Sequence, residues 1–272
     1  MRTLVLREMH EAMHSRWLIA IAVVFALLSL SVSYLSFSGA DALGFAGFNR
    51  TVASLLNLVL LFVPLMGLVT GALGLAGERE DGALGYILSL PVSRAAVFFS
   101  KFLGQGLCLS LAIALGLGLA GLVVGWNAGL DEAGSYGVLA GDALLLGVAS
   151  LGIGLFVGTF AGGRMKALTS ALLVWVWVAF LADLALVGLA VGAHATPATL
   201  FWVSLANPVQ VAKTLCMLAL SAKLETLGPS GLYAVRTFDV GGAAALLCGA
   251  LSAWALVPIA TGWLVFRRQN VR

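Results

Sequence analysis

The stretch TVASLLNLVLLFVPLMGLVTGALGLAG, residues 51–77, decides the fold class of this sequence because it contains no charged residue. About 20 apolar helical residues cross the hydrocarbon core of a bilayer, so this stretch is long enough to span a membrane. Inside lipid its backbone polar groups must be satisfied within the segment, which requires a helix. A transmembrane β-barrel would instead show short alternating strands, and the sequence shows none.

Similar stretches recur along the chain, and the composition agrees with them. Of the 272 residues, 61% are hydrophobic and only 10% are charged, whereas about a quarter of a soluble domain is charged. The sequence therefore predicts an all-α polytopic membrane protein, with residues 1–272 forming one transmembrane domain. Its six predicted spans are Trp17–Phe37, Val52–Ala76, Phe102–Val124, Val138–Phe160, Ala167–Val191 and Ala243–Phe266. A seventh span over Leu200–Leu220 is rejected, because it would contain Pro208 and Lys213.

The basic residues predict the orientation of these spans. Eleven of the fifteen lysines and arginines lie on one side: Arg2, Arg7, Arg16, Arg79, Arg94, Lys101, Arg164, Lys166, Arg267, Arg268 and Arg272. This side is expected to be cytoplasmic and to hold both termini, in the inner membrane of a bacterium. The net charge of +3 thus reflects the basic residues that orient the spans in the membrane, and no nucleic-acid partner is expected.

Two segments outside the spans are predicted to be helical. Residues 1–16 form an amphipathic helix at the cytoplasmic interface, with apolar and charged residues interleaved at helical spacing. The long outer loop, residues 192–239, contains Asn207-Pro208, an N-cap followed by proline in the first turn. The helix that follows runs to about Leu224 and is stopped by Gly228-Pro229. Its apolar face predicts contact with the membrane or with a partner.

The predicted spans contain a few polar residues and several regularly spaced glycines. Asn57, Asp142 and Asp183 are polar candidates for function, although both aspartates lie near outer helix ends where water is close. Glycines at four-residue spacing, such as Gly67/Gly71 and Gly154/Gly158, allow close helix contact. Packing within one subunit is the simpler interpretation, and a dimer contact is the alternative.

Enzymatic motifs are weak in this sequence. His10-Glu11-Ala12-Met13-His14 matches the zinc motif H-E-x-x-H, but the other histidine, His194, is predicted on the opposite side of the membrane. Cys216-Met217 offers soft ligands for Cu(I), and an apolar helix face explains them more simply. The dipeptide Gly-Lys is absent, so there is no phosphate-binding loop. We therefore predict no catalytic residue, metal site or directly bound cofactor.

The most informative segment on the basic side is GEREDGALGYILSLPVSR, residues 77–94. A cluster of charges lies at a helix end, the short apolar run Leu84–Leu90 follows, and Pro91 stops it. The pattern predicts a short amphipathic helix across the cytoplasmic end of the bundle. Tyr86 and Leu88 would be presented to a partner.

This segment resembles the connection between the second and third spans of ABC-2 type ABC transporter permeases, roughly E-R-E-x-G-T-L-x-x-L-L-S-L-P-V-S-R. Ala83 departs from it, where the family has threonine, and Ile87 stands where the pattern has leucine. The resemblance implies a coupling helix that fits a groove on a cytoplasmic ATPase subunit, which binds the ATP and Mg²⁺. It also implies that two permease chains and two ATPase chains form the working unit. The residues to which it assigns coupling are Glu78, Arg79, Glu80, Asp81, Gly82, Leu84, Tyr86, Leu88 and Arg94.

The outer loop is further similar to that of the family's permeases that serve the maturation of nitrous oxide reductase, a copper enzyme. This similarity implies a periplasmic copper-binding accessory protein as a partner. The residues expected to dock it are Asn207, Pro208, Val211, Leu215 and Leu218. Two alternatives remain open: an ABC-2 exporter of an apolar or drug-like molecule, and a membrane zinc metalloprotease.

Overall fold

The computed structural model describes residues 2–38, 48–89, 91–128, 133–192, 195–220 and 228–269. Within these residues every regular element is a helix: α1 (Arg2–Met13), α2 (Arg16–Ser38), α4 (Phe48–Glu80), α5 (Ala83–Ser89), α6 (Arg94–Ala128), α7 (Ala133–Phe160), α8 (Arg164–Val176), the π-helix η1 (Trp177–Leu181), α9 (Ala182–Gly192), α10 (Pro197–Ser204), α11 (Pro208–Leu220) and α12 (Gly228–Arg268). Six stretches, with η1 inside the fifth, are long and apolar enough to cross a membrane. This confirms the predicted fold class.

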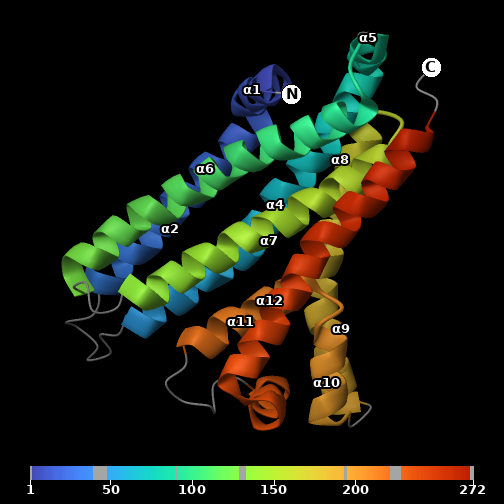
Figure 1. Ribbon diagram of the computed structural model, residues 1–272. Coiled ribbons are helices and arrows are strands. Elements are labelled where there is room, and N and C mark those ends of the chain that lie inside the picture. The colour runs from blue at the N-terminus through green and yellow to red at the C-terminus, as the bar shows by residue number, and fades with distance from the viewer. Residues whose placement is uncertain are drawn as a thin grey trace.

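The spans form a splayed bundle with two different ends (Figure 1). Helices α1 and α5 and the C-terminal end of α12 lie at one end, which we call the α5 end. Helices α10 and α11 lie toward the other, which we call the α11 end. At 13 residues, α11 is too short to cross a bilayer, which needs about 20 helical residues.

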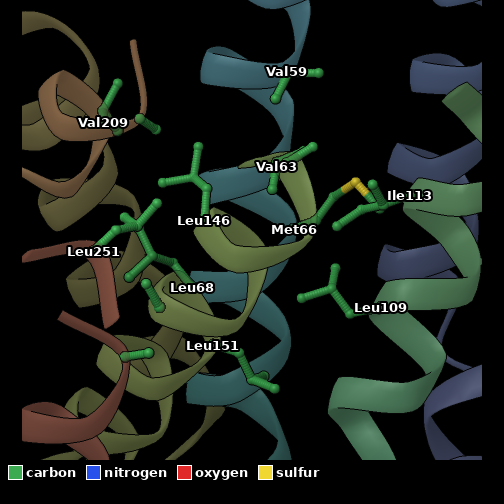
Figure 2. Packing of buried hydrophobic residues seen from close by; sticks show 14 of the residues in the cluster. Val59, Val63, Met66, Leu68, Leu109, Ile113, Leu146, Leu151, Val209 and Leu251 are labelled. Atoms are coloured by element: carbon green, nitrogen blue, oxygen red, sulfur yellow. The ribbon is translucent and has the colours of Figure 1, made fainter. Parts of the chain in front are cut away.

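The centre of the bundle is the packing of α4 against α7. Valine and methionine side chains of α4 meet Leu146 and Leu151 of α7, with Leu109 and Ile113 of α6 on one side and Leu251 of α12 on the other (Figure 2). Glycine makes this contact close: a Cβ on Gly71 would lie 2.6 Å from the carbonyl oxygen of Leu151, and one on Gly154 would lie 2.4 Å from that of Leu68. Two of the predicted glycine pairs thus pack within one chain, as small residues do between helices in lipid.

The fifth span is different, because it is exposed and interrupted. In the most apolar part of this span only 6% of the residues are buried inside the chain, so lipid or another chain must cover it. Its middle is the π-helix η1, a local widening that disturbs the backbone hydrogen bonds of an α-helix. The side chain of Asn207, which precedes α11, donates a hydrogen bond of 2.7 Å to the carbonyl of Val178. A backbone group at the widened turn therefore finds its partner on another helix, as lipid requires.

Helices α10 and α11 form a hairpin between the fifth and sixth spans. Thr196 caps α10 through the backbone N–H of Thr199, and Trp254 of α12 donates a 3.0 Å hydrogen bond to the carbonyl of Leu205 at the turn. Gly228-Pro229, which the sequence analysis interpreted as a helix stop, begins α12 instead. Asp239, with φ of 61°, breaks α12 where the predicted outer loop was expected to end.

Candidate functional site

The turn between α4 and α5 sets the geometry of the site. Helix α4 ends at Glu80, and Gly82 takes a positive φ of 73°, which glycine adopts without the strain that other residues would incur. Helix α5 starts at the next residue. After it, the Ser93 hydroxyl accepts a hydrogen bond from the backbone N–H of Ala96 and caps α6. Glycine and serine thus fix both ends of the connection that carries α5.

Helix α5 has two faces. Leu84 is fully buried and Ile87 nearly so, and both belong to the apolar core of the bundle. On the other face Tyr86 is 71% exposed. Leu88, which was predicted to be presented to a partner, is half-buried and packs against the core on the side of Leu84. The short amphipathic helix predicted from Leu84–Leu90 therefore exists as α5, with Leu90 outside the described residues.

Two predicted coupling arginines bind the ends of other spans. Arg79 donates hydrogen bonds to the carbonyls of Thr159 (2.9 Å) and Ala161 (3.1 Å), where α7 ends. Arg94 donates to the carbonyls of Arg267 (3.1 Å) and Gln269 (2.6 Å), where α12 ends. The last carbonyls of a helix lack internal partners and carry partial negative charge, so a guanidinium stabilises them.

Two acidic residues of the same turn bind the start of the fifth span. A carboxylate oxygen of Glu80 accepts a 2.5 Å hydrogen bond from the backbone N–H of Arg164, the first residue of α8. Asp81 lies 2.5 Å from the guanidinium of Arg164. Gly163 leaves room for the Glu80 carboxylate, since a Cβ at this position would lie 2.7 Å from Oε2 of Glu80. An anion at a helix N-terminus satisfies its unpaired N–H groups and favours its dipole.

Lys101 is the centre of a buried ion cluster that the sequence analysis did not predict. Its ammonium lies 3.0 Å from both carboxylate oxygens of Glu8 and 2.7 Å from Oε2 of Glu78. Its side chain is only 1% exposed. Arg7 reaches Glu78 at 3.3 Å and Glu11 at 2.7 Å. A lysine at the edge of an apolar span needs a carboxylate partner, and this was the signal in the sequence that pointed to such a cluster.

The cluster docks α1 onto the bundle. A Cβ on Gly104 of α6 would lie 2.5 Å from Cβ of Glu8 and 2.9 Å from the backbone nitrogen of Met9, so the two helices touch through that glycine. Burial raises the pKa of the Glu8 carboxyl, and the charge of Lys101 only partly offsets this. Helix α1 is therefore held by a specific buried contact as well as by its amphipathic pattern.

The H-E-x-x-H residues do not form a metal centre within the described chain. His10 and His14 are both exposed, and His14 Nδ1 lies 2.8 Å from the carbonyl oxygen of His10. Glu11 instead pairs with Arg7. Among the described residues, the one group of possible metal ligands is Glu8, Glu11 and Glu78, two of which already face Lys101. His194 lies outside the described residues.

The polar candidates within the spans have three different environments. Asn57 is exposed on α4. Asp183 lies beside α11, where Gln210 hydrogen-bonds to it and Lys213 is 3.5 Å away. Asp142 is 4% exposed, and neither of its carboxylate oxygens has a hydrogen-bond partner among the described residues. The expectation that Asp142 contacts water at a helix end is wrong, because neighbouring helices bury its side chain.

The residues predicted to dock an outer partner are buried within the chain. The buried residues include all five: Asn207, Pro208, Val211, Leu215 and Leu218. Helix α11 packs against α7 and α12, so its apolar face belongs to the bundle. The exposed apolar side chains of this hairpin lie on α10 instead, where Trp202 and Val203 are 53% and 40% exposed.

Comparison with known proteins shows the family of this chain. The family model "ABC-2 family transporter protein" matches residues 2–271, and the chain belongs to that family. It is a permease subunit of an ABC transporter. The chain is 31% identical to the "Probable ABC transporter permease protein NosY" of Pseudomonas aeruginosa, over 99% of this chain and 98% of that protein. It is 29% identical to the protein of the same name from Stutzerimonas stutzeri, over 97% and 96% of the two chains.

Proposed function

We propose that this chain couples ATP hydrolysis by a separate cytoplasmic ATPase to a periplasmic partner during copper-site assembly of nitrous oxide reductase. The observation that carries the proposal is the similarity to two NosY permeases over nearly the whole length of all three chains. A generic exporter of an apolar molecule would require no periplasmic partner. Denitrification is the metabolism in which this reductase acts.

The α5 end is the proposed cytoplasmic side. The ten described basic residues that the sequence analysis placed on one side all lie on helices whose ends meet there (Figure 1). Lysine and arginine next to the spans are retained in the cytoplasm. Both termini then lie on the cytoplasmic side of the bacterial inner membrane, and α11 lies toward the periplasm.

Helix α5 is the proposed contact with the ATPase. Tyr86 projects from its exposed face, while Leu84 and Ile87 anchor the opposite face. Charged residues around α5 transmit a force on this helix to the other spans. Glu80 and Asp81 contact the start of the fifth span, and Glu78 contacts Lys101, which joins α1 to α6. Arg79 and Arg94 contact the ends of α7 and α12. ATP and Mg²⁺ are bound by the ATPase, since the chain has no phosphate-binding loop. Two copies of each chain form the proposed assembly.

The α10–α11 hairpin is the proposed platform for a periplasmic copper-binding accessory protein. The five predicted docking residues hold α11 in the bundle, and the exposed face of α10 around Trp202 and Val203 is presented to the partner. The carbonyl contact of Asn207 and the contacts of Asp183 tie this platform to the fifth span. Movement received at α5 therefore has a path to the opposite end.

The test is a strain that depends on this chain for an active nitrous oxide reductase. We expect Tyr86→Ala to leave the permease in the membrane, to reduce co-purification of the ATPase and to lower the copper content of the reductase. His14→Ala, on the exposed face of α1, is the matched control and should change neither. Full copper loading without this chain would refute the maturation role. Loss of copper loading together with loss of bound zinc in the His14 variant would favour the metalloprotease alternative.

A further inference from the structure

A cavity of about 520 Å³ lies beside α4 at the α5 end. Its walls come from α1, the start of α2, α4, α6 and the first residue of α8, and they include Trp17, Val69, Leu73 and Gln105. Val69 is eleven residues before the end of α4, which is about 16 Å along the helix axis. The cavity therefore extends from the membrane interface into the hydrocarbon region.

The lining of the cavity is charged at the mouth, includes Glu8 and Glu78 that pair with Lys101, and becomes more apolar toward Val69 and Leu73. Arg7, Glu11, Asp81 and Arg164 are all half-exposed and carry both signs of charge. Val69 and Leu73 line the deeper part. A charged mouth of mixed sign above an apolar floor matches a zwitterionic amphiphile, because the head group finds both partners and the chain avoids water.

One buried side chain in the wall lacks a partner. Gln105 is 4% exposed, lines the cavity, and its Oε1 accepts no hydrogen bond from any described group. It lies one helical turn below Lys101 and directly beside Gly74, where a Cβ would come within 1.8 Å of its amide nitrogen. Leaving a buried acceptor unsatisfied is costly. A donor on an occupant of this cavity would satisfy that oxygen.

We propose that this cavity binds a membrane phospholipid with a primary ammonium head group, as in phosphatidylethanolamine. The guanidinium groups of Arg7 and Arg164 match its phosphate. The carboxylates of Glu11 and Asp81 and the free oxygen of Gln105 match its ammonium, which donates hydrogen bonds. The apolar floor at Val69 and Leu73 matches an acyl chain. A choline lipid has the same charges but no N–H donor, so the cavity distinguishes the two head groups.

The test compares lipids on the complete purified chain. Detergent-solubilised, delipidated protein is supplied with phosphatidylethanolamine, phosphatidylcholine or phosphatidylglycerol, and retained lipid is counted by native mass spectrometry while Tm is measured. We expect preferential retention of phosphatidylethanolamine and a higher Tm with it. Equal retention of the ethanolamine and choline lipids would overturn the proposal. A dimer of this chain that excludes lipid from the cavity would also overturn the proposal.

Two variants locate the site. Gln105→Leu removes the unpartnered acceptor and should weaken retention about tenfold, as loss of one hydrogen bond to a charged group predicts, without lowering the Tm of the lipid-free protein. Thr70→Trp places a large ring on the cavity wall and should abolish retention. Asn57→Leu removes an amide from the exposed face of α4 and is the matched control. Unchanged retention in both cavity variants would show that the lipid binds elsewhere.

Discussion

The carboxylate of Glu80, the last residue of α4, accepts a hydrogen bond of 2.5 Å from the backbone N–H of Arg164, the first residue of α8. The end of the second span thus caps the start of the fifth across 84 positions of sequence. The fifth span is otherwise largely exposed. This contact fixes its first turn to the end of α4, beside which α8 also packs.

Glu80→Ala should therefore separate ATP hydrolysis from function. Loss of an N-terminal cap costs about 0.5–2 kcal/mol, which the bundle is expected to survive. We expect ATPase activity to persist in the purified complex while copper loading of the reductase falls. Asp81→Asn, which weakens only the exposed ion pair with Arg164, is the control and should have a smaller effect. Normal copper loading in Glu80→Ala would contradict the role of this contact.

Lys101→Met should destabilise the protein strongly. The substitution leaves Glu8 and Glu78 as buried carboxylates without their shared cation, and breaking a buried ion pair costs about 3–5 kcal/mol. The measurement is thermal unfolding in detergent micelles. Glu78 keeps its contact with Arg7 in this variant. Adding Glu8→Gln removes the other carboxylate charge, so the double variant should recover part of the loss. Strictly additive effects would show that the two residues do not interact.

Gly154→Val should disrupt the contact between α4 and α7. Its Cβ would lie 2.4 Å from the carbonyl oxygen of Leu68, and overpacking a closely packed interior costs about 1–3 kcal/mol. Gly137→Val on the same helix is the control, because nothing lies within 4 Å of its Cβ position. The difference in Tm between the two variants measures the effect. Equal Tm values would contradict the close packing.

Asn207→Leu should loosen the α10–α11 hairpin. It removes the donor to the carbonyl of Val178 in η1 and the cap on the backbone N–H of Val209. An unsatisfied buried carbonyl costs about 1–3 kcal/mol. Faster hydrogen exchange in α11 and η1, with unchanged exchange in α5, is the expected result. Uniformly faster exchange would indicate general unfolding instead.

Asp142→Val should stabilise the isolated protein. The substitution replaces a buried carboxyl, to which no described residue offers a hydrogen bond, by an apolar side chain of similar size. Such a group costs about 1–3 kcal/mol when unsatisfied. Chemical unfolding in micelles tests this, with the exposed Asn57→Val as control. A less stable variant would show that Asp142 has a partner in the folded protein. A more stable but inactive variant would assign the carboxyl to function.

The fold and the α5 helix were predictable from the sequence because both depend on local patterns. Apolar stretches identify spans whatever their neighbours are, and the charges around Glu80 followed by Leu84 and Pro91 identify a short interfacial helix. The cluster around Lys101 was not predicted, since its partner Glu8 is 93 positions away. The burial of Val211 and Leu215 was missed for a related reason. An apolar helix face looks the same whether it meets lipid, a partner or its own bundle.

The π-helix at Trp177–Leu181 makes the length of the fifth span as important as its composition. A π-helical turn holds one residue more than an α-helical turn, so the helix beyond it keeps the direction that places Asp183 beside Gln210 and Lys213. If the same residues formed regular α-helix, the extra residue would rotate α9 by about 100° and turn Asp183 away, although every side chain involved was still present. A change in chain length that this turn does not absorb would therefore separate the hairpin from the fifth span, whereas exchanging one apolar side chain for another would not.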